Sequence, residues 1–457
     1  MDPIVIQGKY TKAEIYAKTI EDGIYSQIYD IINCPAFKDK KVVLMPDVHV
    51  GASGPCGLCA EIGDWICPEH VGVDIGCTVS MMVLNKKIPV EKYAEIEHKI
   101  KKEIPMGTNI RDISIFKANR MLSNYLQERD FYKFLSTNFN IYRQYWPEML
   151  NDLPTTVTEE WISLQLKRLG MDEGVFYKSL GTIGGGNHFI EYDESDDAEY
   201  SSAITLHFGS RNFGVKICKY WTAKAGKGVD KSKIKEITKN FKEEYKKTHS
   251  DMKDFQSALS EVIEQEKAKL IPGYLTRENM KGYLMDMCFG QLYALYNHKV
   301  VQNIISGILY KYDIKVKEIT DTSHNFIDLE DHILRKSAIS AKLGEPMIVP
   351  FNMRDGIAVC IGVGNDNWLN SCAHGAGRKM SRSKAKETLS MEEFKNTMLN
   401  IYSTSVNENT IDESPMAYKD SEEIQEIIQD TCVIKCRLFP KISIKCDEAP
   451  LEPWKNK

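Results

Sequence analysis

The sequence lacks the features of a membrane or secreted protein. No run approaches the roughly 18 consecutive apolar residues of a membrane span. The opening MDPIVIQGKY has no basic segment followed by an apolar stretch. We therefore expect no membrane span and no signal peptide, and the expected location is cytoplasmic.

The chain also lacks an excess of positive charge. Lysine and arginine number 59 against 64 aspartate and glutamate residues, which gives a formal charge of -5. Overall charge cannot hold a polyanion, so a nucleic-acid partner would require a local basic patch.

Cysteine is too sparse for a disulfide framework. Twelve cysteines in 457 residues are typical of buried thiols, metal ligands or reactive groups in a reducing compartment. Cys56 and Cys59 have no second pair at zinc-finger spacing, and Cys432, Cys436 and Cys446 follow no ligand spacing. Most of these thiols are therefore expected in the core.

The chain does have enough apolar sequence for a large core. Hydrophobic residues make up 42% and charged residues 27%, which excludes disorder. No repeat and no low-complexity linker divides the chain, and its glycine- and histidine-rich segments are widely spread. If those segments form one site, residues 1–457 fold around it as a single catalytic domain.

Periodicity predicts a mixed α+β fold. Apolar residues recur every three or four positions in Val90–Glu103 and in the charged region 216–301, which we expect to form a helical insertion broken near Pro272 and Gly273. Loops at strand ends would carry the chemistry. Short apolar runs bounded by turn residues predict strands at Lys41–Met45, Val79–Leu84, Ile204–Phe208, Ile357–Val363 and Ile442–Lys445.

Two glycine-punctuated segments contain candidate metal ligands. In VGVDIGCTVS, Asp74 and Cys77 lie three residues apart, and a carboxylate with a thiolate suits Mn, Zn, Fe or Co better than Mg or Ca. A buried cysteine beside a turn-capping aspartate is the simpler interpretation of this segment alone. In SLGTIGGGNHFIEY, three glycines precede Asn187, His188 and Glu191. Consecutive glycines let the backbone approach a ligand closely, or form a plain hairpin.

Two further segments contain histidines. TLHFGSRNFG has His207 at the end of an apolar run, followed by Arg211, whose guanidinium matches phosphate geometry. DTSHNFIDLEDH contains His324. Nothing in the sequence makes His298 or His332 a ligand, so we expect both to be surface or hydrogen-bonded core residues.

The segment NSCAHGAGRKMSRSKAK surrounds His374 with small residues and continues with basic ones. Small flanks let a bulky ligand reach the imidazole, and backbone amides there can hold phosphate oxygens. A neutral imidazole is also a competent nucleophile. The basic run alone is typical of a solvated helix face, but beside His374 it favours a polyphosphate or RNA-backbone contact. Together, these segments supply the groups of a divalent-metal phosphoryl-transfer site.

The ordered series PDVHVG, VGVDIGC, GTIGGGNHFIE, HFGSR, SHN, RKSA and SCAHGAGRKMSR resembles the RtcB family of RNA ligases from residue 45 to residue 445. The resemblance implies two Mn²⁺ ions bridged by a thiolate, and a guanylate acceptor at His374. The implied metal ligands are Asp74, Cys77, His188, His207 and His324. The implied nucleotide contacts are Asn187, His188, Phe189, Glu191, His324, Asn325, Pro350, Asn352, Met353, Gly375, Ala376, Gly377, Tyr418 and Lys445.

The same resemblance implies a reaction. An RNA 2′,3′-cyclic phosphate or 3′-phosphate end would be joined to a 5′-hydroxyl end at the expense of GTP. His374 would take GMP from GTP and pass it to the 3′-phosphate, and the 5′-hydroxyl would displace it. Glu191 would accept hydrogen bonds from N1 and N2 of guanine. An archease-type activator is a further partner that the resemblance suggests.

The chain departs from the family pattern at three places. The loop PFNMR at Pro350–Arg354 replaces the usual P-G-S-M-G and is followed by Ile357 in place of a serine, Ser337 stands where glycine is usual, and no glycine follows Cys77. Bulk and charge beside the nucleotide leave its identity open and favour a divergent member that repairs cleaved RNA. Two alternatives remain: an RNA cyclic phosphodiesterase without guanylylation, and a non-catalytic protein that binds RNA ends.

Overall fold

The computed structural model describes residues 2–118, 126–226, 231–249, 251–268 and 270–447. Within them, thirteen strands join in one mixed sheet of order β1-β2-β3-β4-β11-β10-β6-β8-β7-β15-β13-β12, with β14 paired to β11, and β5 pairs with β9 in a second, small sheet. The strands are β1 (Ile4–Gln7), β2 (Lys12–Ile15), β3 (Val42–His49), β4 (Cys56–Glu61), β5 (Trp65–Ile66), β6 (Thr78–Leu84), β7 (Phe189–Glu194), β8 (Ser202–Phe208), β9 (Leu275–Thr276), β10 (Val316–Ile327), β11 (Ile333–Ser340), β12 (Pro346–Asn352), β13 (Gly356–Gly362), β14 (Ser371–Ala373) and β15 (Cys432–Ile444).

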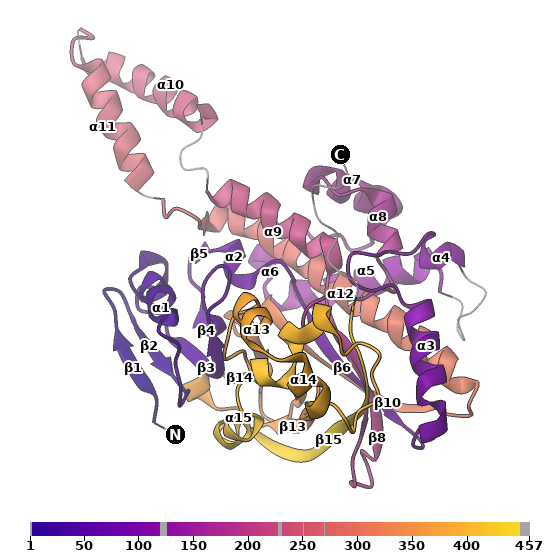
Figure 1. The fold of residues 1–457 in the computed structure, drawn as a ribbon. Helices are drawn as coiled ribbons and strands as arrows, with labels where there is room; N and C mark the ends of the chain where they lie inside the picture. Colours follow the sequence, from indigo (N-terminus) through magenta and orange to yellow (C-terminus); the bar gives the residue numbers. More distant parts are fainter. Residues whose placement is uncertain (1, 119–125, 227–230, 250, 269, 448–457) are drawn as a thin grey trace.

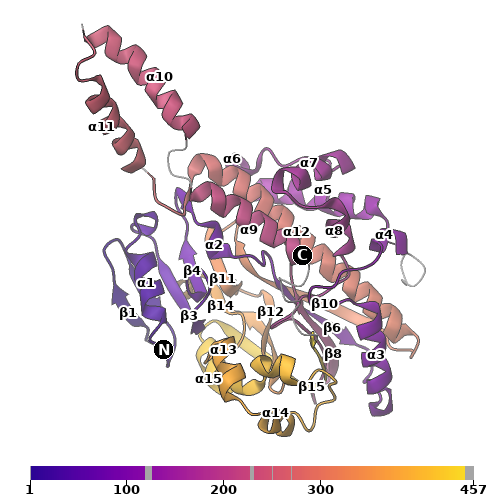
Figure 2. The same cartoon turned by 45° about the horizontal axis from the view of Figure 1, so that its top comes forward.

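Helices lie on both sides of the large sheet (Figures 1 and 2). The α-helices are α1 (Ile24–Ile32), α2 (Pro68–Val71), α3 (Tyr93–Glu103), α4 (Ile115–Ala118), α5 (Glu128–Tyr145), α6 (Pro147–Leu150), α7 (Glu159–Leu169), α8 (Glu173–Lys178), α9 (Arg211–Ala225), α10 (Lys231–Thr248), α11 (Phe255–Ala268), α12 (Arg277–Tyr310), α13 (Arg382–Thr388), α14 (Met391–Thr397) and α15 (Ser421–Ile428). Short 3-10 turns are η1 (Pro35–Phe37), η2 (Val90–Lys92), η3 (Asp366–Trp368), η4 (Glu408–Glu413) and η5 (Pro415–Ala417).

This architecture confirms the α+β prediction, and each of the five predicted strands is present, as β3, β6, β8, β13 and β15. Two of them are longer than predicted. Strand β3 continues through Pro46 and Asp47 to His49, and β15 begins ten residues before the predicted Ile442. The predicted helix at Val90–Glu103 divides into η2 and α3.

The long helix α12 is the centre of the main core. It spans 34 residues and is buried around most of its circumference, as expected for a helix that is apolar on several faces. It packs against α9, α5, α3, α6 and strand β6. In Figures 1 and 2, α9 and α12 run together along one side of the sheet, and α13, α14 and α15 gather on the other.

The region expected to form a helical insertion therefore divides into two parts. Helices α9 and α12 belong to the main body, because Ile217 and Trp221 of α9 and most of α12 are buried in the main core. Only α10 and α11 stand out from the body as a helical hairpin (Figures 1 and 2). The predicted break near Pro272 and Gly273 lies between α11 and α12 and is confirmed. Among the described residues, no helix is long and apolar enough to cross a bilayer.

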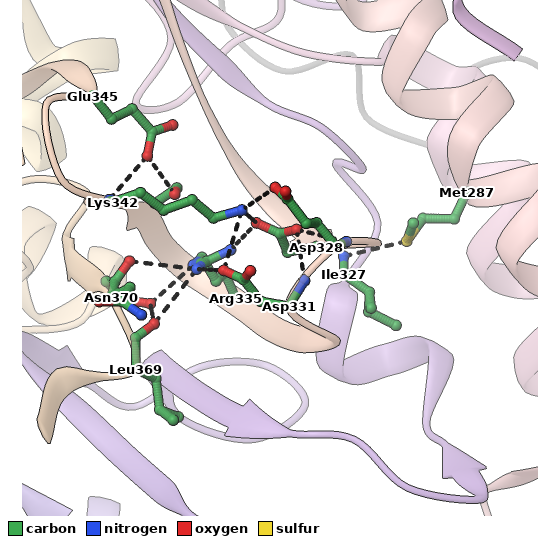
Figure 3. A network of polar contacts seen from close by, with 12 residues as sticks. Met287, Ile327, Asp328, Asp331, Arg335, Lys342, Glu345, Leu369 and Asn370 are labelled. Carbon is green, nitrogen blue, oxygen red and sulfur yellow. Dashed lines mark hydrogen bonds and ion pairs between the residues drawn. The ribbon is translucent and has the colours of Figure 1, made fainter. Parts of the chain in front are cut away.

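A buried arginine fixes the position of β14. The Arg335 side chain is fully buried, and its Nη1 donates to Asp328 Oδ2 at 2.7 Å while its Nε donates to Ser371 Oγ at 2.8 Å. Lys342 and Asp331 complete the ion-pair network around it (Figure 3). Since Ser371 begins β14, this network ties the segment that ends just before His374 to the turn between β10 and β11.

Candidate metal and nucleotide site

Strand register brings the predicted metal ligands together. Val79 and Phe189 both pair with His207 from opposite sides, so Cys77 and His188, two and one residues before them, lie at the same end of the sheet as His207. Ser323 pairs with Thr78, and the His324 amide donates to the Cys77 carbonyl at 2.8 Å. Five residues from four chain segments thus meet where β6, β7, β8 and β10 adjoin.

The side chains at this point form a compact cluster. The ligand atoms of Cys77, His188 and His207 all lie within 4.8 Å of one another. The Cys77 Sγ is 3.6 Å from His188 Nε2, which is 3.0 Å from Asp74 Oδ2. The His207 ring centroid is 5.4 Å from that of His188 and 5.3 Å from that of His324. This spacing allows several of these groups to share one cation.

The imidazoles and the carboxylate of the cluster are in the protonation states that a metal ligand needs, whereas the thiol is protonated. Burial raises the pKa of the Cys77 thiol well above its usual value, and the Asp74 carboxylate raises it further. Burial, followed by the neighbouring imidazoles, lowers the pKa of His207 and of His324, so both rings are neutral. Burial opposes ionisation of Asp74, yet the hydrogen bond from His188 holds the pKa of that carboxyl at about 2. A bound dication would therefore be what makes the thiol ionise.

Unpartnered ring nitrogens show that the donor set fits a metal. Nε2 of His207 and Nδ1 of His324 are buried without a hydrogen-bond partner among the described residues, while His188 turns its Nε2 toward Cys77 and Asp74. Buried polar atoms normally have a partner, and a ligand role would supply one here. A set of one thiol, three imidazoles and one carboxylate matches a transition-metal dication such as Mn²⁺ or Zn²⁺.

His374 lies beside this cluster and has an orienting partner. It follows β14, whose Ala373 pairs with Ala338 of β11, and its ring centroid is 4.9 Å from that of His324. Its Nδ1 is 2.6 Å from Oδ2 of Asp47, whose side chain is fully buried. A carboxylate can only accept, so Nδ1 carries the proton and Nε2 presents its lone pair. Asp47 was missed in the sequence, although it stands in the quoted motif PDVHVG.

A cavity of about 550 Å³ opens between His374 and the metal cluster. His207 and His374 both line it, so the two candidate centres share one space. It also contains most of the predicted nucleotide contacts. They are Asn187, Phe189, Glu191, Pro350, Asn352, Met353, Gly375, Ala376, Gly377, Tyr418 and Lys445.

The glycines after His374 allow a close approach of two backbone segments. Gly377 has a φ of 71°, and a Cβ there would lie 2.3 Å from the carbonyl oxygen of Asp47. A Cβ on Gly375 would lie 2.8 Å from the carbonyl oxygen of Pro350. Glycine is therefore required for this segment to pass between β3 and β12 and form the cavity wall.

Three predicted nucleotide contacts do not line the cavity, namely His188, His324 and Asn325, and the charged residue of the altered loop also lies outside it. Asn325 does not line the cavity: its side chain donates to the Asp74 carbonyl at 3.2 Å and accepts from the Ser337 amide at 2.8 Å. Arg354, the charge expected beside the nucleotide, is exposed and paired with Asp355. Phe351 does line the cavity, and the Arg437 guanidinium lies over its ring at 4.6 Å.

The basic segment after His374 is largely neutralised by carboxylates that the sequence did not reveal. Arg382 pairs with Asp412 and Glu413, and Arg378 pairs with Glu413. Lys445 also pairs with Glu413, at 3.4 Å, and the Tyr418 hydroxyl donates to the same carboxylate at 2.6 Å. Burial opposes ionisation of Glu413, but Lys445 and the two arginines hold its pKa at about 2.

Arg211 was predicted to contact phosphate, but the structure gives its guanidinium other partners. Its Nε donates to Thr182 Oγ1 at 3.0 Å and an Nη donates to the Gly107 carbonyl at 2.7 Å. His298 is a hydrogen-bonded core residue as expected, between Ser80 Oγ at 2.6 Å and the Phe208 carbonyl at 2.7 Å.

Glu191 lies on the cavity wall, and its side chain is almost fully buried. It is buried on β7, and its Oε1 accepts from the Ser443 hydroxyl at 2.7 Å. Burial raises the pKa of its carboxyl to about 7, although the Ser443 hydrogen bond and the Lys445 charge act in the opposite direction. A carboxyl that titrates near neutrality can exchange a proton with a bound ligand.

The fold and the site together define an α+β protein with a thiol–imidazole cluster that could hold a metal ion, beside an oriented histidine. The chain belongs to the RtcB family: the model of that family, described as tRNA-splicing ligase RtcB, matches residues 27–446. The chain is 27% identical to "RNA-splicing ligase RtcB" of Escherichia coli K12, over 93% of this chain and 95% of that protein. It is 24% identical to "tRNA-splicing ligase RtcB" of Methanococcus maripaludis, over 94% of this chain and 92% of that protein.

Proposed function

We propose that this protein is an RNA ligase that joins a 2′,3′-cyclic phosphate or 3′-phosphate end to a 5′-hydroxyl end in RNA repair or tRNA splicing. It uses GTP and two Mn²⁺ ions, and GMP is carried on His374. Family membership and the names of the relatives support the ligase class. The observation that carries the proposal is the 2.6 Å hydrogen bond from His374 to buried Asp47 at the edge of the cavity.

The first step forms a bond between His374 and phosphorus. Because Asp47 holds the proton on Nδ1, the Nε2 lone pair attacks the α-phosphorus of GTP, and the bond to pyrophosphate breaks. The small residues Gly375, Ala376 and Gly377 line the cavity beside the ring, where the phosphate would lie. Bound at the cysteine–histidine cluster, the divalent cations supply charge neutralisation for the triphosphate.

The second and third steps transfer the nucleotide and close the RNA. Where the end is a 2′,3′-cyclic phosphate, water first adds to phosphorus and the bond to O2′ breaks, which leaves a 3′-phosphate and a 2′-hydroxyl. A 3′-phosphate oxygen then takes GMP from His374, which releases the imidazole. The 5′-hydroxyl of the other RNA end then attacks the activated phosphate, and GMP leaves. Lys445 would hold a phosphate oxygen together with Arg378 and Arg382, since all three line the cavity and share Glu413.

Glu191 supplies a basis for choosing guanine. A deprotonated Glu191 accepts hydrogen bonds from N1 and N2 of guanine, and adenine offers neither donor there. Phe189 provides an apolar wall of the same cavity. The loop Pro350–Arg354 does not oppose this assignment, since its charged residue, Arg354, points away toward Asp355.

One experiment separates the ligase from the two alternatives. The protein is incubated with Mn²⁺ and α-labelled GTP, and the protein is assayed for an acid-labile, alkali-stable adduct. The ligase reading predicts an adduct in the wild type and none in His374→Ala. Equal labelling of the two, or none with any divalent metal, overturns the proposal and leaves the phosphodiesterase or the RNA-end binding protein.

A second assay tests the RNA chemistry of a labelled enzyme. Two RNA ends, one with a 2′,3′-cyclic phosphate and one with a 5′-hydroxyl, should be joined only when GTP is present. ATP in place of GTP should give less product, since Glu191 would then face no donor. Addition of an archease-type protein tests whether an activator raises the rate of the first step.

A further inference from the structure

The helical hairpin of α10 and α11 takes no part in the site described above. It projects from the body beyond the ends of α9 and α12 (Figures 1 and 2). The two helices pack on each other through a small core of Tyr245, Phe255 and Leu259, with Phe241 stacked on Phe255 at 5.7 Å. The apolar side of α10 is therefore occupied within the hairpin, and its remaining sides face solvent.

One solvent-facing side of α10 carries a row of lysines. Their spacing of four, three and four residues places them on one face of the helix. All are exposed, and among the described side chains none lies within ion-pair distance of a carboxylate. The row, which we call the lysine stripe, consists of Lys235, Lys239, Lys242 and Lys246.

The lysine stripe differs in charge balance from the cations near the cavity. Arg378, Arg382 and Lys445 all pair with Glu413, so their charge is compensated inside the protein. The four lysines of the stripe form no such ion pair among the described side chains, although Glu236, Glu243 and Glu244 lie on the same helix and the chain as a whole has a formal charge of -5. Four like charges over about 16 Å of helix form a local positive surface on an acidic protein.

We propose that the lysine stripe binds the phosphate backbone of the RNA substrate, away from the ends that are joined. The inference rests on the proposed function, which makes RNA the polyanion that this protein meets. Its place in the chain supports it: α9 begins at Arg211, one residue after Ser210, which contacts Asp74. The hairpin follows the end of α9, about 22 Å further along that helix. Contacts with the phosphate backbone position the RNA and do not depend on its base sequence.

The test compares RNA binding by two variants with equal changes in charge. The first changes all four lysines of the stripe to glutamine. The control changes four exposed lysines that lie elsewhere to glutamine: Lys9, Lys167, Lys311 and Lys315. The probes are a broken RNA hairpin of about 20 base pairs and an RNA with only a few nucleotides beside each end. The dissociation constant is measured over a range of salt concentrations.

The affinity of the stripe variant for the long RNA is expected to depend less on salt concentration than that of the wild type. Each phosphate contact contributes about 0.9 to the slope of log affinity against log salt concentration, so losing three or four contacts lowers the slope by about 3. The control variant and the short RNA should show little change. Conversely, changing Glu236, Glu243 and Glu244 of the same helix to glutamine should strengthen binding of the long RNA.

The labelling of His374 by GTP serves as the second readout, because it needs no RNA. The stripe variant should label like the wild type, which also shows that it is folded. The proposal is overturned if the slope for the long RNA is the same in the stripe variant as in the wild type, or if the control variant loses as much of the slope. It is also overturned if the stripe variant binds the long RNA normally but no longer binds anionic lipid vesicles. Failure of the wild type to label would refute the ligase function alone, since the RNA titration is read independently.

Discussion

The contact between Asp47 and His374 gives the most direct test of the proposed chemistry. Replacing Asp47 by asparagine keeps the size and shape of the side chain but removes an obligate acceptor. The amide can turn its NH₂ group toward Nδ1, and the ring proton then moves to Nε2. In that tautomer the nitrogen that faces the cavity has no lone pair for phosphorus.

The structure sets the expected size of the effect. The carboxylate is fully buried and 2.6 Å from Nδ1, so no water can take its place. Loss of the equivalent aspartate in a Ser-His-Asp triad costs about 10⁴ in rate. We expect Asp47→Asn to slow guanylylation of His374 by about 100- to 10,000-fold, which corresponds to about 3–5.5 kcal/mol in the activation barrier.

The assay is the single-turnover rate of labelling by α-labelled GTP in Mn²⁺. Two measurements separate loss of orientation from loss of structure. Mn²⁺ binding to Asp47→Asn should match the wild type, because Asp47 is not a metal ligand in this arrangement. Unfolding in urea should reveal any cost of leaving the buried Lys419, which donates to the Pro46 and Val48 carbonyls, beside a neutral amide.

Labelling of Asp47→Asn at the wild-type rate would refute the reasoning. It would mean that the tautomer of His374 is set by another group, or that His374 is not the acceptor. His374→Ala distinguishes these outcomes, since only the first of them leaves labelling dependent on His374.

Three further substitutions test the cavity, the metal cluster and the network below β14. Burial raises the pKa of Glu191 to about 7 from 4.5, so stability present below pH 4.5 is lost as the pH rises through 7. Glu191→Gln should therefore gain about 3 kcal/mol over the wild type between pH 4.5 and pH 8 in urea unfolding, and a constant difference would contradict this. Cys77→Ser should weaken Mn²⁺ binding by at least about 100-fold in equilibrium dialysis, and unchanged affinity would exclude Cys77 as a ligand. Asp328→Ala should lower the free energy of unfolding by about 3 kcal/mol because it removes the nearer carboxylate partner of the buried Arg335 and leaves only Asp331, at 3.6 Å, whereas Lys342→Ala should cost less than about 1 kcal/mol.

The segments that meet at the candidate metal site could be singled out from the sequence because each motif is local. Asp74 and Cys77 share one turn, and His188 follows three glycines, so short segments were sufficient to identify them. Their meeting point depends on strand register, which the sequence did not specify. The structure supplies it through the pairing of His207 with both Val79 and Phe189.

Residues that act through distant partners were not predictable in this way. Asp47 and His374 are 327 residues apart, and Pro46 and Asp47 are residue types that normally end a strand. In the structure, β3 nevertheless continues through both residues, and this places Asp47 next to His374. Strand β15 was recognised only at its buried end, since Lys435 and Arg437 interrupt the apolar run that signals a strand.

The basic segment after His374 has much of its charge balanced inside the protein. Asp412 and Glu413 neutralise Arg378 and Arg382, and Lys445 shares the same carboxylate. A triphosphate and two RNA termini bring several negative charges into this neutral surrounding. On the proposed function, that excess has to be met by cations at the cysteine–histidine cluster. On the same proposal, the lysine stripe would act on a different part of the substrate, and a protein with a formal charge of -5 would then hold RNA at both its ends and its backbone.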